Sequence, residues 1–396
     1  MIVRKAFKYK LKTNRDIENK LSMMAGCCRL IWNKALAINL DRLAKKLPLL
    51  WYNEQAYWLT FWKSTEELSF LKECHSQPLQ QTLRNLEKAF KDAFDKKQTN
   101  KRIPRFKRKG QGDSFRFPQG FKLDKGRVYL PKMGWVGYFN SRQITGKPKN
   151  ITVSRHADSW YISVQVEQDI NPVHPSDSIV GIDRGIVKLA ALSDKMIYDP
   201  VSSTKKYAEK LATAQRRLKN KTSFSANWKK QQRKIAKIHR KIAYCRNDRL
   251  HWISNQISKN HAIIVLEDLK VKNMSASAKG TIENPGKNVA AKAGLNKAIL
   301  DQGWSMFASM IEYKQLWRGG QVVYVPPHYT SQTCPCCSHK DKDNRKTQSR
   351  FKCTACQYEN NADIVGALNV LARGHRVLAC GETALADSVK QELNAA

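Results

Sequence analysis

The chain has 396 residues, of which 71 are Lys or Arg and 33 are Asp or Glu, giving a formal net charge of +38. This length accommodates two or three domains with substantial cores, so size does not exclude catalysis. Cations spread over the whole chain favour a polyanionic partner, and nucleic acid fits better than an acidic protein or a membrane surface. The sequence has no signal-peptide pattern and no apolar run of about 18 residues, so we expect a protein that stays in its compartment of synthesis.

Residues 2–11 and 114–167 are rich in strand signals, whereas the stretch between them is rich in helix signals. Apolar and basic side chains alternate in the first segment, and the second contains short aromatic and β-branched runs separated by Gly, Pro and Asn. Apolar residues at steps of three and four predict a helix from Ile17 to Ile38, with Cys28 in its core. We therefore expect a small antiparallel β-barrel with a helical insertion.

Residues 47–71 of this insertion contain a cluster of Trp, Tyr and Phe side chains. We expect most of them to form helical core, while exposed members would stack on bases or enter a groove. A further helix begins at Ser76 and Pro78.

Residues 96–112 combine basic side chains with one proline, two glycines and one aromatic residue, which is typical of an exposed loop. Such a loop either follows a nucleic-acid backbone or is a solvated linker. The first interpretation predicts phosphate contacts from basic residues in and just after the loop: Arg105, Lys107, Arg108, Lys109 and Arg116.

Asp183 lies between two apolar runs, in the segment from Ser178 to Asp194. The first run is short and β-branched, which predicts a strand buried on both faces, and Gly185 permits a turn into a partner strand at residues 187–192. An aspartate at this place either forms the turn or is a metal ligand for phosphodiester chemistry.

Residues 205–250 predict two long basic helices with a break near residues 220–227. Between Lys205 and Arg246, the only acidic residue is Glu209. Helices so poor in acids repel themselves unless phosphates lie beside them, so this region also predicts nucleic-acid binding.

Four apolar residues, Ile263 to Leu266, predict another buried strand, which ends in Glu267 and Asp268. Residues 274–294 show no periodicity and are expected to form a mobile loop. A helix with apolar positions from Leu295 to Ile311 and a buried strand at residues 321–327 follow.

Two CxxC pairs, with fifteen residues between them, have the spacing of a zinc ribbon: Cys334 with Cys337, and Cys353 with Cys356. Four thiolates occupy every position around a tetrahedral ion, so we predict one structural Zn²⁺. Cys336 lies inside the first pair and competes with Cys337 for this role. The other cysteines are scattered and are predicted to be ordinary thiols in a reducing compartment.

Asp363 precedes a short apolar-periodic stretch that predicts a helix ending at Gly374. It is either the N-cap of that helix or the third acid of a site with Asp183 and Glu267. Three clustered carboxylates bind two Mg²⁺ ions about 3.5 to 4 Å apart, which supports phosphodiester hydrolysis. The three acids occur in the order of a ribonuclease-H-like fold. The first belongs to a strand and hairpin, the second to a strand, and the third to a helix.

Several segments resemble the transposon-encoded TnpB proteins, the compact relatives of type V CRISPR effectors. The likeness is carried by GIDRG at Asp183, VLEDLKVKNM at Glu267, TSQTCPCC at the first cysteine pair and ALNVL after Asp363. FKYKL, RLIWN, PLQQTLRNLEKAF and PRFKRKG extend it over nearly the whole chain.

This resemblance implies an RNA-guided DNA endonuclease that binds a guide RNA and double-stranded target DNA, without a membrane, in a prokaryotic cytoplasm at the nucleoid. It implies a multidomain α/β plus β architecture: a wedge β-barrel (1–13 and 113–170), an inserted helical recognition domain (14–112), a RuvC nuclease domain (179–327 and 361–396) and an inserted zinc ribbon (328–360). Two Mg²⁺ held by Asp183, Glu267 and Asp363 would cut the DNA.

Two further hypotheses remain open. TnpB proteins commonly have Asp-Arg-Asp and then Asn-Ala after the last cysteine, whereas this chain has Asn361 and Ala362 before Asp363, then Val365 and Gly366. Residues around a metal ligand set its geometry, so the altered neighbours of Asp363 would weaken metal orientation and slow cutting. The alternative hypothesis is therefore a guide-RNA-dependent DNA-binding protein with weak or no cleavage. A guide-independent zinc-ribbon DNA-binding transposase would explain the charge but leaves the three acids without a role.

Overall fold

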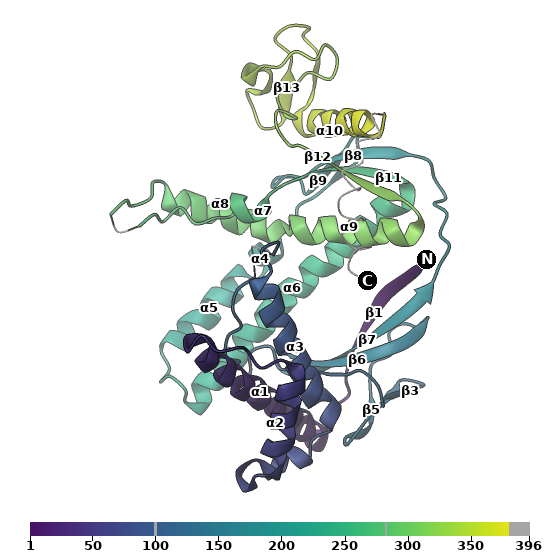
Figure 1. The fold of residues 1–396 in the computed structure, drawn as a ribbon. Helices are drawn as coiled ribbons and strands as arrows, with labels where there is room; N and C mark the ends of the chain where they lie inside the picture. Colours follow the sequence, from purple (N-terminus) through teal and green to yellow (C-terminus); the bar gives the residue numbers. More distant parts are fainter. Residues whose placement is uncertain (99–100, 282, 380–396) are drawn as a thin grey trace. The chain divides into compact units, whose positions relative to one another are not determined.

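The computed structural model describes residues 1–98, 101–281 and 283–379 (Figure 1). It divides into two compact units, Met1–Ile170 and a second unit that begins at Asn171. Within the described ranges, no helix combines the length and the apolar character needed to cross a bilayer.

The first unit contains a four-stranded antiparallel sheet in the order β1-β7-β6-β2 and a three-stranded sheet in the order β3-β4-β5. The strands are β1 (Ile2–Lys10), β2 (Ser114–Phe117), β3 (Lys122–Asp124), β4 (Arg127–Leu130), β5 (Gly134–Gly137), β6 (Lys147–His156) and β7 (Ser159–Asp169). The prediction of one small barrel was therefore too simple. Strand β2 stops before Pro118, which cannot donate a ladder hydrogen bond, and Gly120 takes a φ of 80°, so the chain leaves the first sheet there.

Among the described residues between β1 and β2, which belong to the same sheet, lie three α-helices and a 3₁₀ helix. They are α1 (Arg15–Ala44), α2 (Tyr52–Ser64), η1 (Glu66–Lys72) and α3 (Ser76–Phe94). Cys28 is buried in their core, as predicted.

The aromatic cluster of residues 47–71 is less buried than predicted. Trp62 is 5% exposed, but Tyr57 is 76% and Phe61 is 51% exposed. Neighbouring positions on a helix point in different directions, and α2 packs against η1 and α3, so the aromatic side chains that face away from these elements stay open to solvent.

The second unit is built on a five-stranded sheet in the order β10-β9-β8-β11-β12. Its parallel centre consists of β8 (Ile179–Asp183), β11 (Ile263–Glu267) and β12 (Gln321–Val325), and β9 (Ala190–Leu192) and β10 (Ile197–Tyr198) add an antiparallel edge. The predicted hairpin after Asp183 is confirmed, although its second strand begins at Ala190 and not at residue 187.

Helices cover both faces of this sheet, so its strands are buried on two sides as predicted (Figure 1). Val180, Ile182, Ile264 and Leu266 pack with side chains of α6 (Ala226–Asn260) and α9 (Trp304–Arg318). The alternate positions, including Val265 and Val323, pack with Val370 of α10 (Ala362–Ala379). The residue parity along each strand therefore decides which helix layer a side chain faces.

The remaining helices among the described residues of this unit are α4 (Ser203–Lys206), α5 (Ala208–Lys219), α7 (Val271–Met274) and α8 (Val289–Gln302). Helices α5 and α6 confirm the predicted break near residues 220–227. Helix α8 begins inside the stretch predicted to be a loop, because Ala and Lys favour helix even without an amphipathic pattern. The single helix predicted over Leu295 to Ile311 is two helices, separated at Gly303 with a φ of 68°.

The ribbon between β12 and α10 contains the 3₁₀ helix η2 (Lys342–Arg345) and a small hairpin of β13 (Arg350–Lys352) and β14 (Glu359–Asn361). Helix α10 runs past Gly374, so the prediction that it ends there was wrong. A Cβ at Gly374 would lie 2.3 Å from Val265 Cγ2, and one at Gly181 would lie 2.4 Å from the carbonyl oxygen of Ala367. Both glycines allow α10 to approach the sheet closely.

Candidate active site and metal centre

Asp183 and Glu267 are the last residues of two adjacent parallel strands, β8 and β11. The register pairs Ile182 of β8 with Leu266 of β11, so the two acids occupy equivalent positions at the carboxyl ends of neighbouring strands. Both have the residue parity of Gly181 and Val265, the positions that face α10. The two acids therefore project toward the helix whose first turn contains Asp363.

Asp363 is not the N-cap of α10. The side-chain oxygen of Asn361 accepts hydrogen bonds from the backbone N–H groups of Asp363 (2.9 Å) and Ile364 (3.3 Å), which is the role of a capping residue. The carboxylate of Asp363 is thus left available for another contact. It accepts a hydrogen bond from Arg345 Nη2 at 3.1 Å.

The electrostatics show that the three carboxylates share one region. The pKa of Asp183 is raised to about 7, first by burial and then by the charges of Glu267 and Asp363. Burial also raises the pKa of Glu267, against a hydrogen bond from Thr330 that lowers it. No hydrogen bond to the Asp183 side chain occurs within the described part of the chain, so the turn-forming role has no contact to support it.

The carboxylate oxygens of the three acids do not lie close enough together to be ligands of one ion. Among described residues, they do not form a group in which one oxygen of each lies within 4.8 Å of the others. Ligands shared by two ions about 3.5 to 4 Å apart are spread more widely than ligands of one ion. Hard carboxylate oxygens and crowded negative charge are a donor set that fits Mg²⁺.

A buried arginine joins the backbones that position two of the acids. Arg184, which is 6% exposed, donates to the carbonyl oxygens of Glu267 and, at 3.4 Å, of Trp304. Trp304 Nε1 in turn donates to the carbonyl oxygen of Gly185 at 3.3 Å. The ends of β8 and β11 are therefore fixed to each other and to the start of α9.

Side chains from the ribbon and α10 orient the acids from the other side. Thr330 Oγ1 donates to Glu267 Oε1 at 2.7 Å, and Asn369 Nδ2 donates to the carbonyl oxygens of Thr330 and Thr333, each at 2.7 Å. Sequence reasoning missed Arg184, Thr330, Arg345 and Asn369. Arg184, Thr330 and Asn369 stand inside the quoted GIDRG, TSQTCPCC and ALNVL segments, whereas no local pattern distinguishes Arg345.

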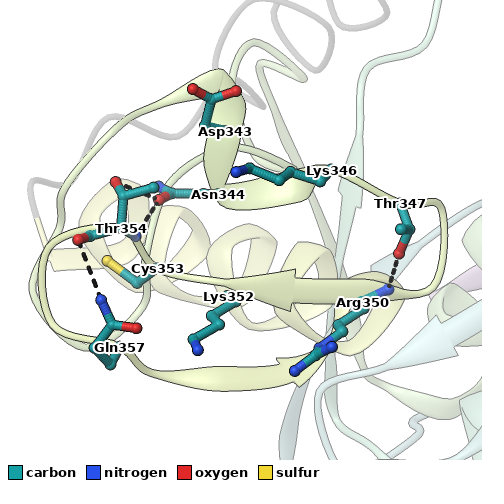
Figure 2. A pocket seen from close by; sticks show the side chains of 9 residues that line it. All are labelled: Asp343, Asn344, Lys346, Thr347, Arg350, Lys352, Cys353, Thr354 and Gln357. Carbon is teal, nitrogen blue, oxygen red and sulfur yellow. Dashed lines mark hydrogen bonds between the residues drawn. The ribbon is translucent and has the colours of Figure 1, made fainter.

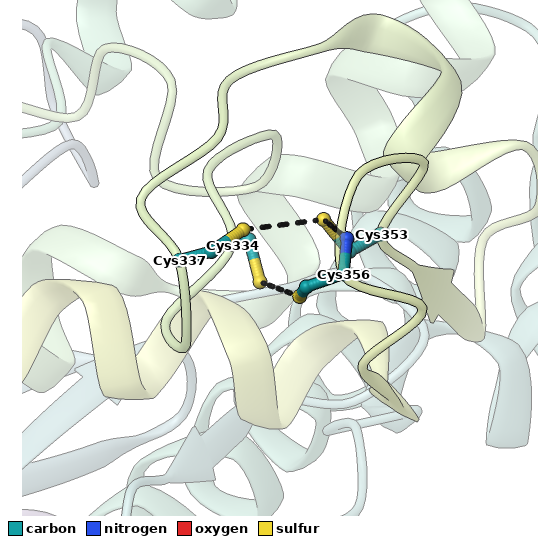
Figure 3. A group of neighbouring side chains, drawn as sticks. All are labelled: Cys334, Cys337, Cys353 and Cys356. Carbon is teal, nitrogen blue, oxygen red and sulfur yellow. Dashed lines mark hydrogen bonds between the residues drawn. The ribbon is translucent and has the colours of Figure 1, made fainter.

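The four predicted cysteines form one cluster at the knuckles of the ribbon (Figure 3). Their Sγ atoms all lie within 4.8 Å of one another, and Cys334–Cys356 and Cys337–Cys353 are each 3.6 Å apart. A tetrahedron with Zn–S bonds of about 2.3 Å has edges of about 3.8 Å, so the cluster fits zinc without rearrangement. Cys336 is exposed and is not part of this cluster, which confirms the predicted register.

Asn344 connects the two knuckles of the ribbon. It is 1% exposed and donates to the carbonyl oxygens of Gln332 and His339. It also accepts from the backbone N–H of Thr354 (Figure 2). An open pocket of about 560 Å³ lies beside it and is lined in part by Lys346 and Lys352. None of the three acids lines this pocket.

The structure separates the predicted basic contacts into two kinds. The loop is tied to α1, because Trp32 Nε1 donates to the carbonyl oxygen of Arg105 and Asn33 bonds both backbone groups of Lys107. The Lys107 ammonium lies 3.8 Å from the centre of the Trp32 ring, and Arg116 donates to Gln165. Arg105, Arg108 and Lys109 are exposed, and Lys107 is exposed as well despite its contact with Trp32. The loop is thus anchored to the helical insertion by its backbone.

Comparison with known proteins gives concordant results. The family described as "Probable transposase" (OrfB_IS605) matches residues 161–278, "Cas12f1-like, TNB domain" matches residues 304–370, and "Helix-turn-helix domain" matches residues 1–47. The chain is 51% identical over 380 residues to "Putative RNA-guided DNA endonuclease InsQ" of Escherichia coli (strain K12), covering 95% of this chain and 94% of that protein.

A second relative, "Putative RNA-guided DNA endonuclease" of Streptomyces pristinaespiralis, is 32% identical over 388 residues, covering 96% of this chain and 92% of that protein. A solved structure titled "Cryo-EM structure of the Cas12f1-sgRNA-target DNA complex" superimposes with a TM-score of 0.53 at 12% identity. It covers 93% of this chain and 98% of that one, so the likeness in fold extends over both units.

Proposed function

The chain belongs to the TnpB family of transposon-encoded proteins, and from this premise we propose that it is an RNA-guided DNA endonuclease. The observation that carries the proposal is the placement of Asp183 and Glu267 at the ends of adjacent parallel strands, facing the first turn of α10 with Asp363. The long relatives named as RNA-guided DNA endonucleases support the same activity.

The three acids are proposed to hold two Mg²⁺ ions against the scissile phosphate. Bound Mg²⁺ supplies an activated water and stabilises the leaving oxygen. The protein's part is to hold the ligands. Asp183 and Glu267 project from rigid strand ends joined by Arg184, and Thr330 fixes one oxygen of Glu267. Arg345, which lies in the ribbon, holds Asp363 by a hydrogen bond. Asp363 is the last residue of Asn361-Ala362-Asp363, which stands in this chain in place of the Asp-Arg-Asp run of TnpB proteins.

The four-cysteine cluster is proposed to hold one structural Zn²⁺. Its closed set of thiolates leaves no position for water, so the ion would act on folding and not on hydrolysis. The same ribbon contains Arg345, so an ordered ribbon also orients Asp363.

We assign roles to the parts of the chain as the resemblance implies. Residues 1–13 and 113–170 form the wedge, 14–112 the recognition domain, 179–327 with 361–396 the RuvC domain and 328–360 the zinc ribbon; residues 380–396 lie outside the described part. The partners are a guide RNA and double-stranded target DNA, which the protein holds by shape and phosphates while base pairing selects the sequence. The place of action is the cytoplasm, at the nucleoid.

Purification of the full chain with its bound RNA, followed by incubation with matching target DNA and Mg²⁺, tests the proposal. The proposal expects cleavage by the wild-type complex, and DNA binding without cleavage by Asp183→Ala. Binding without product in the wild type would instead establish the guide-dependent binding protein. Absence of any co-purifying RNA would favour the guide-independent transposase, and cleavage that persists in Asp183→Ala would show that the metal site lies elsewhere.

A further inference from the structure

The tip of the α5–α6 hairpin presents an aromatic pair to solvent. Phe224 is 74% exposed, and its ring centre lies 5.2 Å from that of Trp228 on the first turn of α6. The arms beneath are fixed, because Gln231 Nε2 donates to the carbonyl oxygen of Ala214 at 2.8 Å across the hairpin. The pair therefore stands on a rigid support, and the described residues of its unit leave Phe224 exposed and Trp228 half-buried.

The backbone at Phe224 is strained for its residue type. The N–H of Ser225 donates to the carbonyl oxygen of Thr222, which closes a four-residue turn with Phe224 in the third position and a φ of +66°. Turns with a positive φ at that position ordinarily have Gly or Asn there, because a bulky side chain clashes with its own backbone. Strain of this kind is characteristic of functional sites.

The charge around this tip is of one sign. No acid occurs from Lys210 to Asn247, and the exposed cations nearest the tip are Arg216, Arg217, Lys219, Lys229 and Lys230. Exposed rings among cations are the arrangement by which proteins hold single-stranded nucleic acid, with bases stacked on rings and phosphates on cations.

We propose that the Phe224–Trp228 tip is a stacking site for an unpaired base of the guide RNA, with the flanking cations holding the adjacent phosphates. The proposal rests on the proposed function, since it takes the guide RNA as the resident polyanion. The backbone strain at Phe224 is then explained by function: a ring stands at a position where Asn or Gly would be more stable. Ring and strain can be changed separately, which makes the proposal testable.

The experiment uses the full chain and labelled RNA of the sequence that co-purifies with the wild type. Three variants are compared at one salt concentration: Phe224→Tyr keeps the ring and the strain, Phe224→Leu keeps only the strain, and Phe224→Asn removes both. We expect Phe224→Leu and Phe224→Asn to bind the RNA about 5-fold to about 150-fold more weakly, and Phe224→Tyr to bind as the wild type does.

Thermal unfolding of the RNA-free variants gives the second readout. Phe224→Asn should raise the Tm by roughly 2–4 °C, because Asn tolerates a positive φ, while the other two variants stay near the wild type. Ala157→Gly is the matched control, since Ala157 has a φ of 57° in the β6–β7 turn and its own side chain has neither a ring nor a charge. It should leave RNA binding unchanged.

A structural role for the ring predicts the opposite pattern, in which Phe224→Leu lowers the Tm and leaves RNA affinity unchanged, and this result would overturn the proposal. Loss of affinity for single-stranded DNA of the same sequence, with RNA affinity intact, would overturn the choice of RNA. A wild-type protein that carries no RNA contradicts both this inference and the proposed function, whereas RNA binding that is insensitive to Phe224 contradicts the inference alone.

Discussion

Replacing Gly374 by Ala measures how closely α10 packs on the nuclease sheet. The added Cβ would lie 2.3 Å and 2.8 Å from the two γ-carbons of Val265, which is fully buried and β-branched and so cannot turn away. Overpacking of this kind costs about 1–3 kcal/mol, and the better helix propensity of Ala offsets about 1 kcal/mol of it. We expect a net loss of up to about 2 kcal/mol and a Tm lowered by roughly 2–4 °C per kcal/mol.

Gly294→Ala in α8 is the matched control, because a Cβ there meets nothing within 4 Å. The same substitution should stabilise this helix by about 0.5–1 kcal/mol. Thermal unfolding of both variants by circular dichroism in one buffer gives the comparison. Two shifts of opposite sign support the packing described for α10, whereas a raised Tm in Gly374→Ala would refute it and with it the close approach of α10 to β11.

Three further predictions concern the ribbon and the basic loop. Cys353→Ser should release the zinc and lower the Tm, measured by elemental analysis and thermal unfolding, because three thiolates no longer close the tetrahedral site. Arg108→Gln with Lys109→Gln should reduce the slope of log affinity for guide RNA against log salt by about 1.4 to 1.8, as two lost phosphate contacts require. Arg345→Gln should slow DNA cleavage by about 10-fold to 100-fold at unchanged DNA affinity, because Asp363 loses the side chain that orients it.

Each of these has a control on the same protein. Cys336→Ser should retain the metal, since Cys336 lies outside the cluster. Lys195→Gln with Lys259→Gln removes two exposed charges from the second unit and should leave the salt slope as it is. Zinc retained in Cys353→Ser, an equal slope in both charge variants, or DNA affinity lost in Arg345→Gln would contradict the respective prediction.

The order of elements around the acids was predictable because it depends on local patterns. Short β-branched runs that end in Asp183 and Glu267 are buried on both faces, and this burial makes their apolar character continuous. The spacing of the CxxC pairs likewise specifies the cysteine cluster without knowledge of the fold.

The contacts that orient the acids could not be predicted, because they join residues far apart in the chain. Arg345 meets Asp363 only when the ribbon folds back on α10, and Thr330 meets Glu267 across 63 residues. Gly374 locally favours the end of a helix, yet α10 continues through it. The glycine is needed there because a side chain would clash with Val265 of β11. Tertiary packing decided these cases against local preference.

The central claim is that Asp183, Glu267 and Asp363 together hold two divalent cations. Electron paramagnetic resonance of the protein with guide RNA, target DNA and Mn²⁺ tests it most directly. The claim predicts two spin-coupled Mn²⁺ ions per chain, about 3.5 to 4 Å apart, and loss of the coupled pair in Asp183→Asn. A coupled pair that survives in Asp183→Asn, or a wild-type complex without one, would contradict it.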